Sequence, residues 1–160
     1  MRLEKRSNEL LIYDEKNLIL ISMDHREIID LIDNDDGTAT PVFDEKSNQI
    51  EYSYREEDEE SWGAGSNLFA STHDIKAMAD GIRSVISHQQ NRVEYSCQND
   101  YFCIAIEYNE KSDTYSFTAS LIETLMGKYH ITVTKTKLSM EDLQQYIQPF
   151  FIWEKDFPIV

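Results

Sequence analysis

Residues 71–89 read STHDIKAMADGIRSVISHQ, and the rest of the chain can be placed relative to this stretch. Its apolar residues recur at steps of three and four, which predicts an amphipathic helix with one buried stripe: Ile75, Met78, Ala79, Ile82, Val85 and Ile86. Ser71 is a candidate N-cap, and Asp74 follows three residues later as its capping-box partner. Because such a stripe needs an apolar surface to cover, the helix is expected to lie on one face of a sheet.

The segment after this helix alternates between apolar and polar residues with the period of a β-strand. A two-residue turn at Asn99-Asp100 gives the first two strands one shared apolar face, with Cys97 opposite Phe102, Tyr95 opposite Ile104 and Val93 opposite Ile106. Turns at residues 109–113 and 126–128 add a third and a fourth strand. The pattern predicts a four-stranded antiparallel meander whose apolar face the helix covers.

The N-terminal part also predicts strands, in a less regular pattern. Residues 10–13 and 18–23 are apolar runs, which predict an opening hairpin around a turn at 14–17. Residues 27–32 fit either a strand or a helical turn. The sequence DNDDG at residues 33–37 closes them as a turn.

Two further strand pieces are predicted before the helix, at residues 41–43 and 50–54, with residues 44–48 between them. Gly63-Ala64-Gly65 predicts a tight bend or bulge, because it is too short to cradle a phosphate. No internal repeat or linker is visible in the sequence.

The C-terminal segment predicts a second, short helix that begins at the N-cap Ser139. Pro149 is expected to kink or restart it. The aromatic residues that follow are expected to dock on the sheet: Phe150, Phe151, Trp153 and Phe157. Residues 1–160 are thus interpreted as one α+β domain. Its antiparallel sheet consists of N-terminal hairpins and a C-terminal four-stranded meander, packed against a central helix, with a short C-terminal helix.

The chain has a net charge of -15 over 160 residues. Residues 1–62 carry 18 acidic and 7 basic side chains, a balance of -11, so the acidity belongs mainly to the first part. Such a surface repels nucleic acid and anionic membranes and favours encounter with a basic protein. The alternative interpretation is that the acidity only keeps the protein in solution.

The sequence also predicts a cytoplasmic location. No stretch reaches the roughly 20 apolar residues that span a bilayer, and the basic N-terminus lacks the apolar core of a signal peptide. The two cysteines, Cys97 and Cys103, fall on opposite faces of the predicted sheet, which argues against a disulfide between them.

No motif in the chain predicts catalysis, a metal or a cofactor. His25-Arg26-Glu27 matches the H-x-E of zinc deaminases, but the required P-C-x-x-C pair is missing. A calcium loop with Gly37 at its sixth position would put Ile32 and Phe43 where carboxylates are required. The four histidines, at positions 25, 73, 88 and 130, do not have metal-ligand spacing. A non-enzymatic protein is expected.

Five consecutive carboxylates, at residues 56–60, form the densest acidic stretch and are expected to be exposed. Trp62 follows them closely. It fits either a residue folded onto the core or an interface anchor within an acidic patch, since tryptophan is favoured at binding hot spots.

Several of these segments together resemble small immunity proteins of bacterial toxin systems. The resemblance covers about residues 50–160 and rests on the order of the following segments: Trp62-Gly63, Asn67-Leu68-Phe69, the helix with Asp74-Ile75 and Ile82, Val93-Glu94-Tyr95, and Leu138-Ser139-Met140-Glu141-Asp142-Leu143. The nearest likeness is to the WapI-like group and to CdiI-type immunity proteins of contact-dependent growth inhibition.

This resemblance implies a cytoplasmic protein that binds the C-terminal domain of a cognate toxin, a basic nuclease that often cleaves transfer RNA, and blocks it. It supplies no catalytic residue to carry over. The failed motifs and the acidic charge predict no cofactor and no direct contact with nucleic acid. The expected toxin-binding residues are Glu56, Glu57, Asp58, Glu59, Glu60, Trp62, Asp33, Asp35 and Asp36. The alternative is a ligand-sensing or accessory protein-binding domain with a small pocket between helix and sheet.

Overall fold

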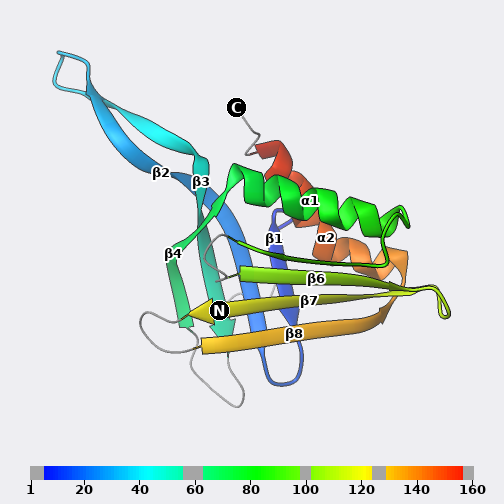
Figure 1. The fold of residues 1–160 in the computed structure, drawn as a ribbon. Coiled ribbons are helices and arrows are strands. Elements are labelled where there is room, and N and C mark those ends of the chain that lie inside the picture. Colours follow the sequence, from blue (N-terminus) through cyan, green and yellow to red (C-terminus); the bar gives the residue numbers. More distant parts are fainter. Residues whose placement is uncertain (1–5, 56–62, 98–101, 124–128, 157–160) are drawn as a thin grey trace.

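The computed structural model describes residues 6–55, 63–97, 102–123 and 129–156, and these ranges contain eight strands and two helices (Figure 1). In chain order they are β1 (Glu9–Tyr13), β2 (Leu18–Asp33), β3 (Ala39–Arg55), β4 (Gly63–Ser71), α1 (Thr72–Ile86), β5 (Arg92–Ser96), β6 (Phe102–Asn109), β7 (Thr114–Glu123), β8 (Tyr129–Leu138) and α2 (Met140–Asp156). Four strands followed by a helix therefore occur twice. The order of elements therefore repeats, although the sequence shows no internal repeat.

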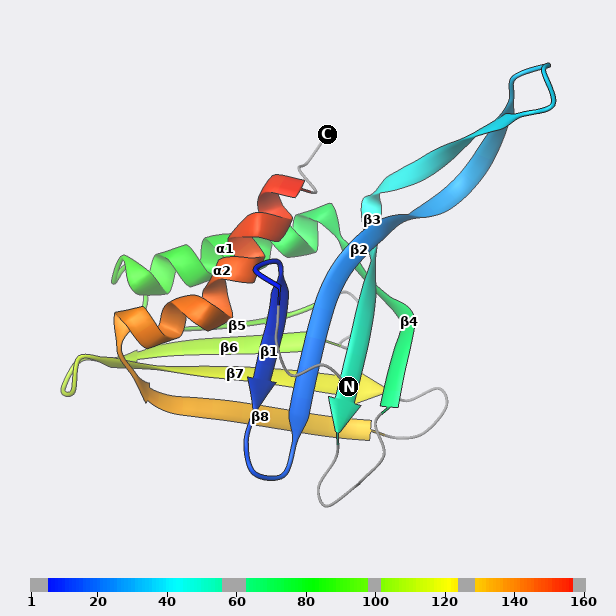
Figure 2. The ribbon, with the colours of Figure 1, turned by 180° about the vertical axis from the view of Figure 1, so that it is seen from behind.

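The strands form two antiparallel sheets, with strand orders β1-β2-β3-β4 and β5-β6-β7-β8. The predicted α+β class, N-terminal hairpins and C-terminal meander are confirmed. In Figures 1 and 2 the strands of one sheet run across those of the other. The apolar face of the meander is covered by more than the central helix, because α1, α2 and β2 all contact the second sheet.

The predicted register of the meander is confirmed. Val93 pairs with Ile106, Tyr95 pairs with Ile104, and the Cys97 N–H donates to the Phe102 carbonyl oxygen at 3.0 Å. The strict alternation of these strands explains the success, because a shift by one residue would turn every apolar side chain to the outer face. The turns at residues 98–101 and 124–128 lie outside the described residues.

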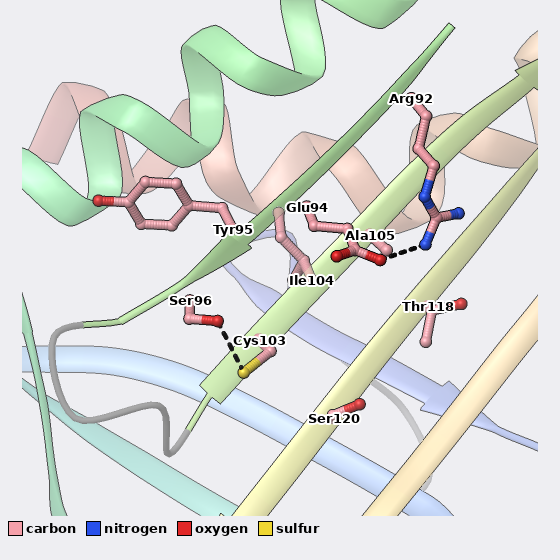
Figure 3. A pocket seen from close by; sticks show the side chains of 9 residues that line it. All are labelled: Arg92, Glu94, Tyr95, Ser96, Cys103, Ile104, Ala105, Thr118 and Ser120. Carbon is pink, nitrogen blue, oxygen red and sulfur yellow. Dashed lines mark hydrogen bonds and ion pairs between the residues drawn. The ribbon is translucent and has the colours of Figure 1, made fainter.

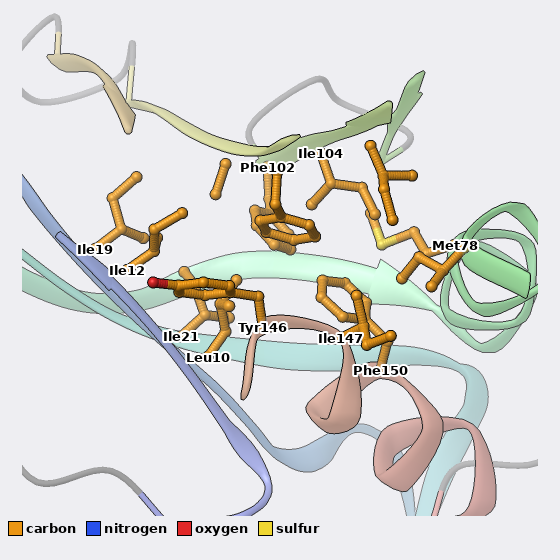
Figure 4. Close-up of a cluster of buried hydrophobic side chains, with 14 of the residues drawn as sticks. Leu10, Ile12, Ile19, Ile21, Met78, Phe102, Ile104, Tyr146, Ile147 and Phe150 are labelled. Carbon is orange, nitrogen blue, oxygen red and sulfur yellow. The ribbon is translucent and has the colours of Figure 1, made fainter. Parts of the chain in front are cut away.

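The core lies between the meander and the elements that cover it (Figure 4). Leu10, Ile12, Ile19 and Ile21 of the first sheet lie on one side. Met78 of α1 and Phe102 of β6 lie toward the other side, with Tyr146, Ile147 and Phe150 of α2 between the elements. The predicted stripe of α1 is confirmed as core, since Ile75, Met78, Ala79, Ile82 and Val85 are all at most 2% exposed.

Strands β2 and β3 are longer than the sequence pattern indicates. Residues 27–32, which fitted a strand or a helical turn, belong to β2. Residues 41–43 and 50–54 are not separate pieces, because β3 runs unbroken from Ala39 to Arg55. The pairing of β3 with β2 is irregular between the two predicted pieces, since Asn48 pairs with Arg26 and the next paired residue of β3 is Phe43, opposite Ile28. Gly63-Ala64-Gly65 pairs with β3 inside β4, and a register shift follows it.

Gly81 faces Val93 where α1 crosses β5, and a Cβ at this position would lie 2.8 Å from the Val93 Cγ1. Alanine at Gly81 gains about 1 kcal/mol of helix propensity. Overpacking against a branched side chain that is stiff at χ1 costs about 1–3 kcal/mol. We expect Gly81→Ala to lower the free energy of unfolding by about 1 kcal/mol. Urea denaturation checks this result.

The matched background for that test is Val93→Ala, which removes the opposing methyl groups. On this background Gly81→Ala is expected to raise the free energy of unfolding by about 1 kcal/mol, because only the propensity gain is left. The same sign on both backgrounds would contradict the contact.

Helix α2 begins as the sequence predicts, with the Asp142 N–H donating to Ser139 Oγ at 3.1 Å. Pro149 lies inside the helix, which continues to Asp156, and Figure 2 shows α2 changing direction along its length. The expected docking of the tail is confirmed for Phe150 and Trp153, which are both buried, and Phe151 is half-buried. Phe157 lies outside the described residues.

One ion pair joins the two helices. Arg83 of α1 donates from Nη1 and Nη2 to the two carboxylate oxygens of Glu154 in α2, at 2.9 and 2.5 Å. These hydrogen bonds hold the pKa of Glu154 below its usual value of 4.5. A carboxyl group with a lowered pKa in the folded state stabilises the fold above its unfolded pKa, and this stabilisation disappears as the pH falls through the folded value.

We therefore expect Glu154→Gln to lower the free energy of unfolding at pH 7 by less than about 1 kcal/mol, because the pair is partly exposed to solvent. The difference from wild type should vanish as the pH falls below the usual pKa of glutamate, 4.5. Urea denaturation across the acid range checks this. A difference that grows toward acid pH would contradict the assignment.

Candidate binding surface

The distal parts of β2 and β3 form a two-stranded arm that projects away from the body of the molecule (Figures 1 and 2). We define the arm as residues 23–49. Strand β1 pairs with β2 only as far as Ser22, and β4 pairs with β3 only from Ser47 onward. Beyond those points β2 and β3 pair with each other, up to Asp33 opposite Ala39. The arm therefore carries its turn well outside the core.

Asparagine and threonine side chains close the turn of the arm. The Asn34 N–H donates to the Thr38 carbonyl oxygen at 3.1 Å. The Asn34 side-chain amide donates to Thr38 Oγ1 at 3.1 Å and to Thr40 Oγ1 at 2.9 Å. Asp35 has a φ of 61° and Gly37 a φ of 85°, in the left-handed region that aspartate tolerates and glycine favours. The predicted turn is confirmed, and its shape is specified by these residues.

Two aspartates of the turn accept hydrogen bonds from its own backbone. Asp33 Oδ1 accepts from the Asp35 N–H at 2.9 Å, and Asp36 Oδ1 accepts from the Thr38 N–H at 2.9 Å and from the Thr38 hydroxyl. The hydroxyl and amide of Thr38 lower the pKa of Asp36 below its usual value of 3.8. The turn thus presents fixed negative charge at neutral pH.

The end of the arm is both acidic and apolar. Asp30, Asp33, Asp35 and Asp36 are all exposed, and residues 30–40 include no Lys or Arg. Leu31 is 61% exposed and Ile32 is 54% exposed. Because neighbouring strand residues point to opposite faces, each face of the arm carries one of these apolar side chains. Carboxylates around apolar side chains suit contact with a basic protein surface.

The structure describes one of the two predicted acidic segments, the turn of the arm. Glu56, Glu57, Asp58, Glu59, Glu60 and Trp62 lie outside the described residues. Their described neighbours, Arg55 and Gly63, stand at the end of β3 opposite the arm's turn. A strand of 17 residues separates the two ends by roughly 50 Å. Of the predicted site residues, the described ones are Asp33, Asp35 and Asp36, and they share the turn.

The outer face of the second sheet carries a shallow hollow of about 310 Å³ (Figure 3). Small side chains such as Ala105, Ser120 and Cys103 lie in it, with Arg92 at its rim. The Arg92 guanidinium already donates to two carboxylates, those of Glu94 and Glu107. The predicted alternative placed a pocket between helix and sheet, whereas this hollow lies on the opposite face, away from both helices.

Asp74 at the start of α1 is one of two buried acidic residues among those described, at 7% exposure. Its carboxylate accepts a hydrogen bond from the Tyr95 hydroxyl at 3.0 Å. Burial and this carboxylate raise the pKa of Tyr95 to about 12. The pair joins α1 to β5, so its role is structural.

The two cysteines lie on the second sheet, and His88 lies just beyond α1. Cys97 is buried and Cys103 is half-buried, and they lie on opposite faces of the sheet as predicted. His88 follows the end of α1 with a φ of 63°, and its ring lies 4.3 Å from the ring of Tyr108 at an interplanar angle of 45°. Among the described residues no group of three or more His, Cys, Asp or Glu could hold a metal ion.

Comparisons with known proteins do not place the chain in a family. No family model matches it, and no curated protein sequence matches it. The solved structure of the plant transcriptional regulator PBF-2 aligns over 96% of this chain and 89% of its own chain, with 10% identity and a TM-score of 0.46. At these values the likeness carries no argument about function. No described helix is long and apolar enough to cross a membrane.

Sequence reasoning missed Leu31 and Ile32 as site residues. Both belong to a run that fitted either a strand or a helical turn, since Ile28, Ile29, Leu31 and Ile32 are all apolar. The sequence signal that could have identified these two residues is the position of the run directly before DNDDG at residues 33–37. Two strands that flank such a turn form a hairpin. Adjacent apolar residues of one strand then point to opposite faces of the hairpin.

Proposed function

We propose that the chain is an immunity protein, which binds the C-terminal domain of a cognate toxin, a basic nuclease, and neutralises it without catalysis of its own. The observation that carries this proposal is the arm, which holds four exposed aspartates and two exposed apolar side chains outside the body. A nuclease presents Lys and Arg to the phosphates of its substrate. An acidic arm can occupy that same surface in place of the nucleic acid.

Charge and apolar contact affect different rate constants of binding. Long-range attraction between the net charge of -15 and a basic toxin raises the association rate. Leu31 and Ile32 would then be buried against the toxin, and this apolar contact would slow dissociation. A cell that makes both proteins needs both properties, because free toxin acts on its own nucleic acids.

Co-expression tests the proposal. Under this proposal a toxin gene lies directly upstream of the gene for this chain, and the C-terminal domain of that toxin is the probe. We expect a stable complex on size exclusion and restored growth of cells that make the toxin domain. A toxin domain that forms no complex and kills cells at the same rate with and without this chain would contradict the function.

The hollow on the second sheet supports a second candidate, a domain that senses a small polar ligand. Its volume of about 310 Å³ reaches the lower end of the range for ligand sites. It ranks second because Arg92, its one cationic side chain, already binds two carboxylates. Ala105→Leu, which fills the hollow, should leave toxin neutralisation unchanged under the first function, whereas it should abolish ligand binding under the second.

A further inference from the structure

The outer edge of β2 in the arm faces no other described strand. Strand β1 leaves β2 after Ser22, and β3 lies on the opposite side of β2 along the arm. An open strand edge offers backbone N–H and C=O groups to an incoming strand. A two-stranded ribbon is also marginally stable by itself in water, so a third strand would stabilise it.

Hydrogen bonds at the turn determine which backbone groups point outward. The bond from the Asn34 N–H to the Thr38 carbonyl marks that pair as hydrogen-bonded. Hydrogen-bonded and non-hydrogen-bonded pairs alternate along an antiparallel ladder. Asp33 opposite Ala39 and Leu31 opposite Pro41 are therefore non-hydrogen-bonded pairs. The N–H and C=O groups of Leu31 and Asp33 consequently point to the open edge.

Two further facts agree with this orientation. Pro41 has no N–H, so it fits a position that donates nothing to the ladder. The Leu31 N–H donates to Asp30 Oδ1 at 2.8 Å, away from β3. An incoming carbonyl oxygen can replace this carboxylate, and the released Asp30 side chain would then be available to a cation of the incoming segment.

The two edges of the arm differ. Pro41 removes a donor from the outer edge of β3, which is a common protection against strand addition. The edge of β2 keeps the Leu31 N–H, which donates to the side chain of Asp30. Residues 24–49 carry eight acidic and two basic side chains, so a strand that adds here meets strong negative charge. A Lys- and Arg-rich segment has the complementary charge.

We infer that the edge of β2 at residues 30–33 binds an extended, Lys- and Arg-rich segment of a partner protein by strand addition. The backbone of that segment pairs with Leu31 and Asp33, and its cations pair with Asp30, Asp33, Asp35 and Asp36. For the identity of the partner, the inference rests on the proposed function, in which the segment belongs to the toxin domain. The mode of binding rests on the geometry of the edge.

A peptide of alternating lysine and threonine, about ten residues long, tests the edge independently of any toxin. We expect it to slow hydrogen exchange of the Leu31 and Asp33 amides at least about fivefold at saturation, since each gains a backbone hydrogen bond. The matched control peptide has the same charge and N-methyl groups on alternate residues. It should not slow these amides, and equal slowing by both peptides would overturn strand addition.

Leu31→Pro and Ala39→Pro form the matched pair of variants, one on each edge of the arm. Neither residue donates its N–H to the ladder, and the strand backbone before each position tolerates proline. Leu31→Pro should weaken peptide binding about fivefold, the equivalent of one lost backbone hydrogen bond. Ala39→Pro should leave it unchanged.

The outcomes separate the two proposals. If the Leu31→Pro and Ala39→Pro variants bind the peptide with equal affinity, strand addition is overturned, even if the chain neutralises the toxin. Strand addition of the peptide without toxin neutralisation would overturn the immunity function and leave the edge site intact.

Discussion

Replacing Trp153 with alanine is expected to lower the free energy of unfolding by about 4 kcal/mol, the range for a buried aromatic residue. Trp153 is 1% exposed and packs edge-on against Phe150, with ring centroids 4.9 Å apart. Its indole N–H also donates to the Asn8 carbonyl oxygen at 2.7 Å. The residue therefore attaches α2 to the start of β1, across 145 positions of the chain.

Urea denaturation of two further variants completes this test. Trp153→Phe keeps an aromatic ring but loses the bond to Asn8, so a smaller loss of about 1–2 kcal/mol is expected. Gln148→Ala changes an exposed residue of the same helix and should stay within about 0.5 kcal/mol of wild type. A loss below about 1 kcal/mol for Trp153→Ala would mean that α2 does not anchor the first sheet.

The second large effect concerns the arm. Reversing its turn charges with Asp33→Lys, Asp35→Lys and Asp36→Lys is expected to lower the association rate constant with the toxin domain about 100-fold at low salt. The three side chains are exposed, and no Lys or Arg lies within residues 30–40 to compensate them. Stopped-flow fluorescence measures the rate. The difference from wild type should shrink as salt rises, because exposed charges are screened.

The control reverses the same number of charges on the body, with Glu15→Lys, Glu110→Lys and Asp156→Lys. All three are exposed and lie outside the arm. We expect a decrease of less than about tenfold, because only the net charge changes. Equal effects of the two triple variants would show that overall charge, and not the arm, steers the toxin.

The meander could be predicted residue by residue because its strands alternate strictly and its turns are short. Ile104 and Ile106 each lie between apolar partners on both neighbouring strands, so one register alone buries them all. The arm could not be predicted in the same way. Strand β3 continues through Asp44-Glu45-Lys46, residues of low β propensity, although its pairing with β2 skips from Phe43 to Asn48 and β4 pairs with it only from Ser47 onward.

The candidate surface could be predicted only in part. Asp33, Asp35 and Asp36 were identified by their charge and their place in a turn, and the structure groups them at the end of the arm. The other predicted acidic residues, at positions 56–60, lie outside the described residues. That run stays a prediction. Charge reversal at Glu57, Asp58 and Glu59 would test it through the salt dependence of toxin affinity.

We propose that the acidic arm is the surface that a basic partner recognises. Hydrogen exchange of the full chain, alone and bound to the proposed toxin domain, tests this role. Slower exchange is expected in residues 30–40 on binding, with the outer face of the second sheet unchanged. Protection confined to the body, with residues 30–40 exchanging as fast as in the free protein, would contradict it.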